Sequence, residues 1–199
     1  MKATRDRSNV LLIVVNLAYL LPRLMYLDRS TIEVRHIDKM GRNAVDSNML
    51  FIDGLRIPVK DRIGEEGKGF SYLLHGLNPE RILIASEAIG LGRAALEKAT
   101  LYAKERHVFG RPIGQNQGIQ HPLAQAWMQL EAADLVTLKA AALYDAGKPC
   151  GEYANAAKYL AAEAGFQSCQ TAIQTLGGMG YAKEYHVERT ASGIKPCPQ

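Results

Sequence analysis

The sequence is short of the residues that build disulfide frameworks and zinc sites. Its 199 residues include three cysteines, Cys150, Cys169 and Cys197, and no two of them stand in a C-x-x-C spacing. An odd number of widely separated cysteines argues against a disulfide scaffold and favours a reducing compartment. The five histidines also lack the spacing of metal ligands, so we expect no metal site.

No long stretch of the chain carries charge of one sign. The net charge is +4, but basic and acidic residues alternate, as in Lys60-Asp61-Arg62. A nucleic-acid-binding surface needs a continuous basic stripe, so we expect no nucleic acid partner. Phosphate-binding loops, nucleophile elbows, internal repeats and low-complexity tracts are also absent from the sequence. With 47% hydrophobic and 22% charged residues, the composition is that of an ordinary soluble globular protein.

The longest apolar run, Val10 to Leu21, follows three basic residues, which is the outline of a signal peptide or a membrane anchor. Asn16 interrupts the run, which is shorter than the ~20 residues of a membrane-spanning helix. The β-branched segment Leu11 to Val15 predicts a buried β-strand instead. A membrane-anchored form of residues 10–27 remains the alternative, and it predicts sedimentation with membranes.

Residues 1 to about 65 have the pattern of β-strands. Residues 31–37 alternate apolar with polar side chains, which predicts one strand. Residues 49–52 and 55–57 are short apolar runs on either side of Asp53-Gly54, a dipeptide typical of hairpin turns. We therefore expect a hairpin there, with its second strand ended by Pro58.

From Gly69 onward the pattern becomes helical. We expect a first helix from Asn78 to about Arg106, with Asn78 as N-cap, Pro79 in the first helical position and Glu80 in the first turn. A second helix should run from about Pro122 to Ala146.

A third helix is expected from about Glu152 to Leu176, ending at a glycine cluster. It carries a ridge of mostly small residues at four-residue spacing, which permits close helix packing: Ala157, Ala161, Gly165, Cys169 and Ile173. A fourth helical start near Glu184 has little length before Gly193 and Pro196. The pattern predicts an incomplete four-helix bundle.

Four motifs in register carry a family resemblance. They are residues 61–70 (DRIGEEGKGF), 78–82 (NPERI), 103–117 (AKERHVFGRPIGQNQ) and 174–181 (QTLGGMGY). Their order and spacing resemble the carboxy-terminal half of acyl-CoA dehydrogenases, strongly over residues 39–189. One such motif is weak evidence, but four in register are strong.

The resemblance implies a mainly α fold: an incomplete C-terminal four-helix bundle preceded by part of a middle β-barrel. Residues 1–65 would be the partial barrel, residues 66–190 the bundle without its last helix, and residues 191–199 an irregular tail. In the family, FAD lies between the barrel and the bundle.

The resemblance also implies chemistry. Desaturation of an acyl-CoA removes a proton α to the thioester carbonyl and a hydride from the β carbon, so it needs a base opposite the flavin. A glutamate in a dry pocket suits that role, since burial raises its pKa. Some family members carry the base on the first bundle helix beside an arginine, and Glu80 matches that position. Asn78 and Arg81 match positions that line the acyl-CoA pocket. The plain structural alternative is that Glu80 only neutralises the helix dipole.

The remaining candidates match family residues that contact the FAD of the adjacent subunit. Arg106, Phe109 and Gln117 resemble one such group, and Gln174, Gly177 and Gly178 resemble another, where glycines let backbone donors approach the cofactor. Taken singly, these residues also suit plain structural roles, such as a helix C-terminus or a helix stop.

The predicted function is therefore FAD-dependent dehydrogenation of an acyl-CoA, by a truncated or partial form of the enzyme. The resemblance implies an electron-transfer flavoprotein as electron acceptor, a homo-oligomer (dimer or tetramer), and a location in the mitochondrial matrix of a eukaryote or the cytoplasm of a bacterium. Two alternatives stay open: an inactive half-length form that associates with full-length subunits, and an acyl-CoA oxidase.

Overall fold

The computed structural model describes residues 29–39, 44, 47–56, 58–62 and 64–193. The strand predicted at residues 11–15, the membrane-anchored alternative for residues 10–27 and the last six residues lie outside this range. Within it, no helix combines the length and the apolar character needed to cross a membrane. The chain divides between Leu77 and Asn78 into two units, which are described separately.

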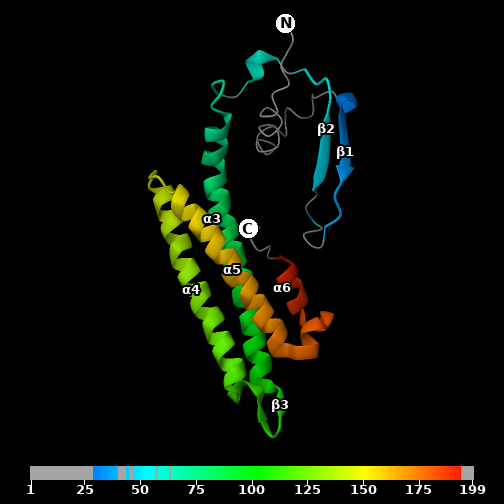
Figure 1. Cartoon of the computed structure of the whole chain (residues 1–199), viewed down its shortest axis with the longest axis vertical. Coiled ribbons are helices and arrows are strands. Elements are labelled where there is room, and N and C mark those ends of the chain that lie inside the picture. The colour runs from blue at the N-terminus through cyan, green and yellow to red at the C-terminus, as the bar shows by residue number, and fades with distance from the viewer. Residues whose placement is uncertain (1–28, 40–43, 45–46, 57, 63, 194–199) are drawn as a thin grey trace. The chain divides into compact units, whose positions relative to one another are not determined.

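The first unit contains a two-stranded antiparallel sheet (Figure 1). Strand β1, Ile32–His36, pairs with β2, Asn48–Ile52, so that Ile32 faces Ile52 and His36 faces Asn48. The Arg35 guanidinium lies 4.6 Å from the centre of the Phe51 ring, a cation–π contact across the two strands. Short 3-10 helices at Arg29–Thr31 and Val59–Asp61 flank the sheet.

The prediction of a hairpin turn at Asp53-Gly54 is wrong. The Asp53 amide donates to the Thr31 carbonyl at 3.1 Å, which extends the pairing of β2 with β1. Gly54 then adopts φ +69°, and residues 55 and 56 form no strand. Residues 55 and 56 therefore do not form the second strand of a hairpin with β2.

Helix α3, Gly69–Glu105, begins nine residues before its expected start. The Lys68 carbonyl accepts bonds from the Ser71 amide and hydroxyl, and these bonds organise the first turn well before Pro79. Pro79 lies inside the helix, so Asn78 is not an N-cap and Glu80 is not in the first turn. The predicted end, near Arg106, is confirmed.

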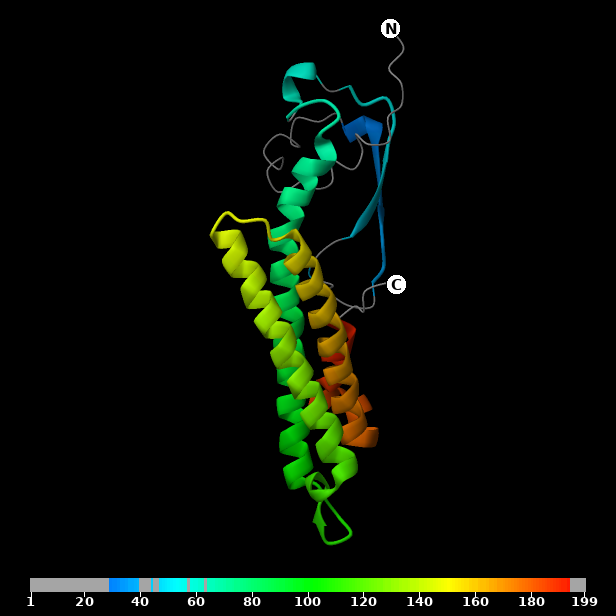
Figure 2. The ribbon, with the colours of Figure 1, turned by 60° about the vertical axis from the view of Figure 1, so that its left-hand side comes forward.

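Two further long helices pack with α3 in the bundle (Figures 1 and 2). Helix α4, Gln117–Asp145, starts five residues earlier than expected, because the extended Asn116 offers its carbonyl to the Ile119 and Gln120 amides. Helix α5, Gly151–Leu176, matches its expected bounds to within one residue. The mainly α architecture, with an incomplete helical bundle, is confirmed.

The bundle core consists largely of alanine, and this allows very close helix packing. On the predicted α5 ridge, Ala157, Ala161 and Cys169 have no exposed surface. A Cβ placed on Gly92 of α3 would lie 3.1 Å from the Gly165 Cα and 2.9 Å from a Leu130 methyl. The backbones of α3 and α5 therefore meet at a pair of glycines, as the small-residue ridge predicted.

Polar contacts tie α4 to its neighbours at the surface. Arg93 of α3 donates 2.8 Å hydrogen bonds to Glu131 and Asp134 of α4, and these bonds raise the pKa of Arg93. Lys139 of α4 lies 2.9 Å from the Tyr153 hydroxyl and 4.1 Å from its ring centre. Exposed ion pairs of this kind contribute about 0–1 kcal/mol each, so apolar packing dominates the stability of the bundle.

The chain after α5 forms three short helical pieces: η4, Gly177–Tyr181; η5, Lys183–Tyr185; and α6, Val187–Gly193. The α-helix begins three residues later than the expected start at Glu184. Val187 is fully buried, and the rings of Tyr185 and Tyr102 meet edge to face at 5.8 Å. These contacts hold the segment against the bundle, near the end of α3.

Candidate functional site

The two predicted substrate-binding residues, Asn78 and Arg81, lie together on α3. The Arg81 guanidinium donates a 3.2 Å hydrogen bond to the Asn78 side-chain oxygen, and both side chains are half-buried. A Cβ on Gly151 would lie 3.8 Å from the Asn78 amide nitrogen, so Asn78 borders the start of α5. The pair forms a polar cluster near the junction of α3 and α5.

The candidate base, Glu80, is exposed and lies about three turns into α3. The helix dipole acts mainly within the first turn, so neutralising the dipole is not the role of Glu80 here. A base for an α-proton needs poorly hydrated surroundings. Since the described residues leave Glu80 exposed, another polypeptide segment would have to supply that cover.

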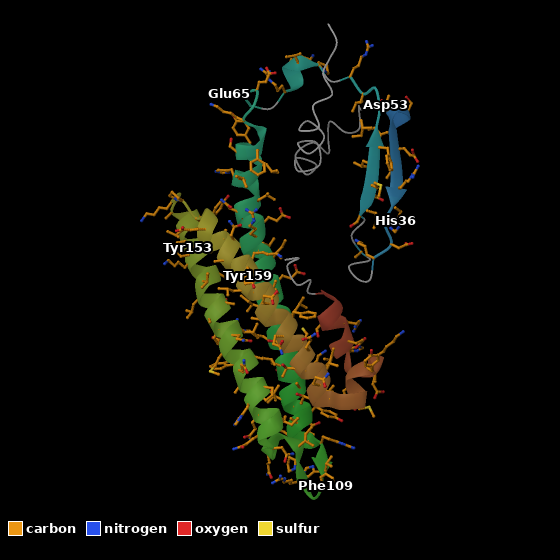
Figure 3. The ribbon with its side chains drawn as sticks, in the orientation of Figure 1. His36, Asp53, Glu65, Phe109, Tyr153 and Tyr159 are labelled. Atoms are coloured by element: carbon orange, nitrogen blue, oxygen red, sulfur yellow. The ribbon has the colours of Figure 1, made fainter. Side chains whose placement is uncertain are left out.

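Phe109 stands at the tip of a hairpin between α3 and α4 (Figure 3). Strands β3, His107–Val108, and β4, Arg111–Pro112, pair through a two-residue loop, Phe109-Gly110. Both loop residues have positive φ, +53° and +80°, which is the signature of a type I′ turn. A phenylalanine is strained in this conformation, and its side chain is fully exposed. The fold thus holds an apolar ring in water at a cost in stability.

Arg106 and Gln117 flank this hairpin. The Arg106 backbone donates to Tyr102 and accepts from Ile113, but its guanidinium is exposed and has no hydrogen-bond or ion-pair partner in the described part of the chain. Gln117 is the first residue of α4, where unpaired backbone amides favour an anion. Both side chains are available to a ligand from outside the chain.

The hairpin loop is fastened to the bundle by side chains that sequence reasoning missed. Arg111 donates to the Asn116 side-chain oxygen at 2.6 Å, and the Asn116 amide donates to the Ile113 carbonyl. Gln120 donates to the Gly114 carbonyl at 2.8 Å. An Asn-Gly dipeptide would have signalled the turn, but Phe109-Gly110 does not.

The second predicted flavin group follows α5. Gln174 is exposed, and its carbonyl accepts the Gly177 amide that caps the helix. Gly177 has φ +58°, so the fold itself requires a glycine there. A Cβ on the exposed Gly178 would have no described atom within 4 Å. Gly178 therefore leaves open space for an approaching group.

The structure brings the two flavin groups to one end of the bundle and keeps Glu80 away from them. The Tyr102–Tyr185 contact joins the end of α3 to the segment after α5. Figure 3 shows Phe109 at the opposite end of the bundle from Tyr153, near the start of α5. At 1.5 Å per helical residue, Glu80 and Glu105 are about 37 Å apart along α3. The predicted base and the predicted flavin-contact residues of one chain are therefore too far apart to belong to a single small site.

The residues at the hairpin end suit a dinucleotide. Arg106 can pair with a pyrophosphate, the Gln117 and Gln174 amides can both donate and accept, and Phe109 offers an apolar surface to a ring. The open space at Gly178 admits close approach to the backbone. The exposed donors and the fully exposed ring thus fit a dinucleotide such as FAD.

Comparisons with known proteins show the family of the chain. The family model "Acyl-CoA dehydrogenase, C-terminal domain" matches residues 67–196. "Acyl-CoA dehydrogenase fadE12" of Mycobacterium bovis is 48% identical over 140 residues, which cover 69% of this chain and 36% of the relative. "Short-chain specific acyl-CoA dehydrogenase, mitochondrial" of Rattus norvegicus is 42% identical over 152 residues, covering 76% of this chain and 37% of the relative.

Among solved structures, butyryl-CoA dehydrogenase from Megasphaera elsdenii superimposes with a TM-score of 0.77 at 35% identity, covering 82% of this chain and 43% of that one. The chain thus spans less than half the length of each of these relatives. The matched region contains both flavin groups and the Asn78–Arg81 cluster.

Proposed function

Since the chain belongs to the acyl-CoA dehydrogenase family, we propose that it is a partial form of an enzyme that dehydrogenates acyl-CoA thioesters between the α and β carbons. Members of this family are flavoproteins. The observation that carries the proposal is that strained, exposed Phe109 shares one end of the bundle with Arg106 and Gly178. No contact among the described residues accounts for that arrangement, and it suits a bound flavin dinucleotide.

In the proposed reaction, the Glu80 carboxylate accepts the proton that leaves the α carbon of the acyl group. Arg81 and Asn78 hold polar parts of the thioester ligand, with their mutual hydrogen bond setting the orientation of the guanidinium. Bound FAD would accept the hydride from the β carbon. The protein's task is to position these groups and to exclude water from the base.

We propose that the chain works in a homo-oligomer, a dimer or tetramer. A flavin dinucleotide is too short to contact both Glu80 and the hairpin end, which lie about 37 Å apart along α3. Arg106, Phe109, Gln117, Gln174, Gly177 and Gly178 would then contact the flavin of an adjacent subunit, and Glu80 would face a different flavin.

Three further expectations belong to this proposal. Residues 1–65 would be the later strands of the family's β-barrel, residues 66–190 its bundle and residues 191–199 a tail. An electron-transfer flavoprotein would reoxidise the flavin. The enzyme would act in the mitochondrial matrix of a eukaryote or the cytoplasm of a bacterium.

An inactive form that associates with full-length subunits is a second candidate. The exposure of Glu80 favours it, and so does the outer face of α4, where large apolar side chains are more than half exposed: Trp127, Met128, Leu135 and Leu138. A compact, well-folded monomer in solution would count against this candidate. An acyl-CoA oxidase would differ only in the access of oxygen to the reduced flavin.

Flavin reduction tests the catalytic role of Glu80. The full chain is saturated with FAD without oxygen and mixed with a straight-chain acyl-CoA, and loss of the visible flavin band is followed. Removing a general base typically slows a reaction about 10²- to 10⁴-fold, so Glu80→Gln should slow reduction by that factor.

Glu97→Gln is the matched control, because Glu97 is an exposed glutamate on the same helix. It should reduce flavin at the unchanged rate. Equal rates for the Glu80→Gln variant and the unchanged chain would remove Glu80 as the base. Tight FAD binding without any reduction by acyl-CoA would favour the inactive form.

A further inference from the structure

Helix α3 crosses the boundary between the two units of the chain. Residues 69–77 of the helix belong to the first unit, and its remaining residues, from Asn78 to Glu105, belong to the second. The structure describes every residue of α3, and none before Ile82 is buried. The helix therefore passes from one unit to the other without a buried side chain to hold it.

The helix is fixed on the bundle side of this boundary. A Cβ on Gly151 of α5 would lie 3.8 Å from the Asn78 amide nitrogen, so the Asn78 side chain borders another helix of the bundle. Arg81 donates its 3.2 Å hydrogen bond to Asn78 across one turn, and Ile82 next to it is buried in the core. From Asn78 onward, α3 is thus part of the packed bundle.

The helix is also fixed within the first unit. The Glu65 amide donates a 3.2 Å hydrogen bond to the Tyr72 hydroxyl. The Tyr72 ring packs over Gly64, where an added Cβ would overlap it. These contacts join the first turn of α3 to the loop that precedes it, so both ends of the crossing are held.

Two residues that weaken a helix lie between these fixed points. Pro79 has no amide hydrogen, so the His75 carbonyl lacks its helical partner, and a proline ring also crowds that carbonyl. Gly76 restricts the backbone less than any other residue type would. A Cβ on Gly76 would meet no atom within 4 Å, so packing does not require a glycine there. The backbone of α3 is therefore least constrained just before Pro79, at residues 75–77.

We propose that residues 75–77 form a hinge in α3, at which the first unit changes its direction relative to the bundle. Sharp helix kinks occur mostly at prolines, and hinges are short segments that absorb a change of backbone angles. The predicted base and substrate residues, Glu80, Asn78 and Arg81, all follow the hinge. They keep their arrangement on the bundle while the segment before them moves.

Spin-label distance measurements on the full chain test the hinge. The labels are attached at Phe70→Cys and Ala142→Cys, two exposed positions on helices, in a chain that also carries Cys197→Ser. The other two cysteines are buried. Phe70 lies about 14 Å before Pro79 along the helix axis, so a kink of about 20° moves it sideways by about 5 Å. The hinge predicts a broad distribution of label distances.

The double substitution Gly76→Ala with Pro79→Ala removes the hinge. It restores the missing hydrogen bond and places a good helix former at both positions, and the Cβ at residue 76 meets open space. The distance distribution should become about 5 Å narrower. Gly90→Ala with Pro122→Ala is the matched control, because it makes the same replacements at exposed positions of α3 and α4. It should keep the broad distribution.

Amide hydrogen exchange separates bending from unfolding. A helix that bends at residues 75–77 keeps its first turns, so the amides of residues 73 and 74 should exchange at least about 10-fold more slowly than in an unstructured peptide. Exchange at the unstructured rate would overturn the inference, since no helix would be present to bend. Equal widths of the distance distribution in the hinge variant, the control and the unchanged backbone would overturn it as well.

Discussion

Replacing Gly92 by alanine should destabilise the bundle, although alanine is the better helix former. The new Cβ would lie 2.9 Å from one Leu130 methyl, 3.2 Å from the other and 3.1 Å from the Gly165 Cα. Leu130 is completely buried and Gly165 contributes backbone, so neither can move aside without shifting a helix.

The magnitude follows from two opposing terms. Adding a methyl group to a packed core costs about 1–3 kcal/mol, and replacing glycine by alanine inside a helix gains about 0.5–1 kcal/mol. The midpoints of these ranges differ by about 1 kcal/mol, so we expect a net loss of about 1 kcal/mol. Gly90 of the same helix is exposed, and a Cβ added there would have no neighbour within 4 Å, so Gly90→Ala should gain about 0.5–1 kcal/mol.

Urea denaturation of the full chain, followed by far-ultraviolet circular dichroism at one protein concentration, measures both changes. The two midpoints should move in opposite directions from that of the unchanged chain, with equal slopes. A Gly92→Ala variant as stable as Gly90→Ala would show that α3 and α5 do not meet closely at Gly92 and Gly165.

Two further predictions concern single residues. Phe109→Asn should raise the free energy of unfolding by about 1 kcal/mol in a urea titration, because asparagine tolerates positive φ in a type I′ turn. The same variant should weaken FAD binding. A variant that keeps full FAD affinity would refute the role of the ring. Burial raises the pKa of the Cys169 thiol, and a hydrogen bond to Thr190 lowers it by a smaller amount. Cys169 should therefore react with Ellman's reagent far more slowly in the native protein than in protein unfolded by urea. As the pH rises, the Cys169 thiol loses its proton in the unfolded chain before it does so in the folded chain. The thiol therefore costs no stability below its ordinary pKa, and the free energy of unfolding falls as the pH rises from that value to the folded-state pKa. Rapid labelling of native Cys169 would contradict this account.

The sequence predicts helix ends better than helix starts in this chain. Gly110 and Gly177 follow α3 and α5 closely, and both ends were predicted to within about one residue. Both proline-based starts were wrong, because Pro79 and Pro122 lie inside their helices. A helical proline leaves the carbonyl four residues earlier without a partner.

That loss is tolerated here for a local reason. The carbonyls concerned belong to His75 and Gly118, and both residues are exposed, so water can satisfy them. A sequence pattern does not reveal which side of a helix is solvent-exposed before the packing of the bundle is known. The preference of proline for the first helical position therefore gave the wrong start twice.

Strand pairing was misjudged because the turn signal is local and the pairing is not. Asp53-Gly54 is a favoured hairpin dipeptide, yet Asp53 hydrogen-bonds with Thr31, twenty-two residues earlier in the chain. The preceding strand was already paired with β1, so the glycine turns the chain away from it. Nothing in residues 49–57 themselves indicates this competition.

The candidate site could be found from the sequence only through the family resemblance. The motifs name Glu80, Arg106 and Gly178, and the expected first helix already separates Glu80 from Arg106 along its length, but no local pattern shows that Gly178 lies at the same end of the bundle as Arg106. The strained turn at Phe109 and the open space at Gly178 are also invisible in the sequence. Each depends on backbone conformations that tertiary contacts impose.

An anaerobic absorbance spectrum of the full chain, taken with FAD before and after addition of an acyl-CoA, tests the central claim most directly. The account predicts a protein-bound flavin band that bleaches with acyl-CoA and bleaches at least about 100-fold more slowly in Glu80→Gln. A chain that retains no flavin absorbance once unbound FAD is removed would contradict it.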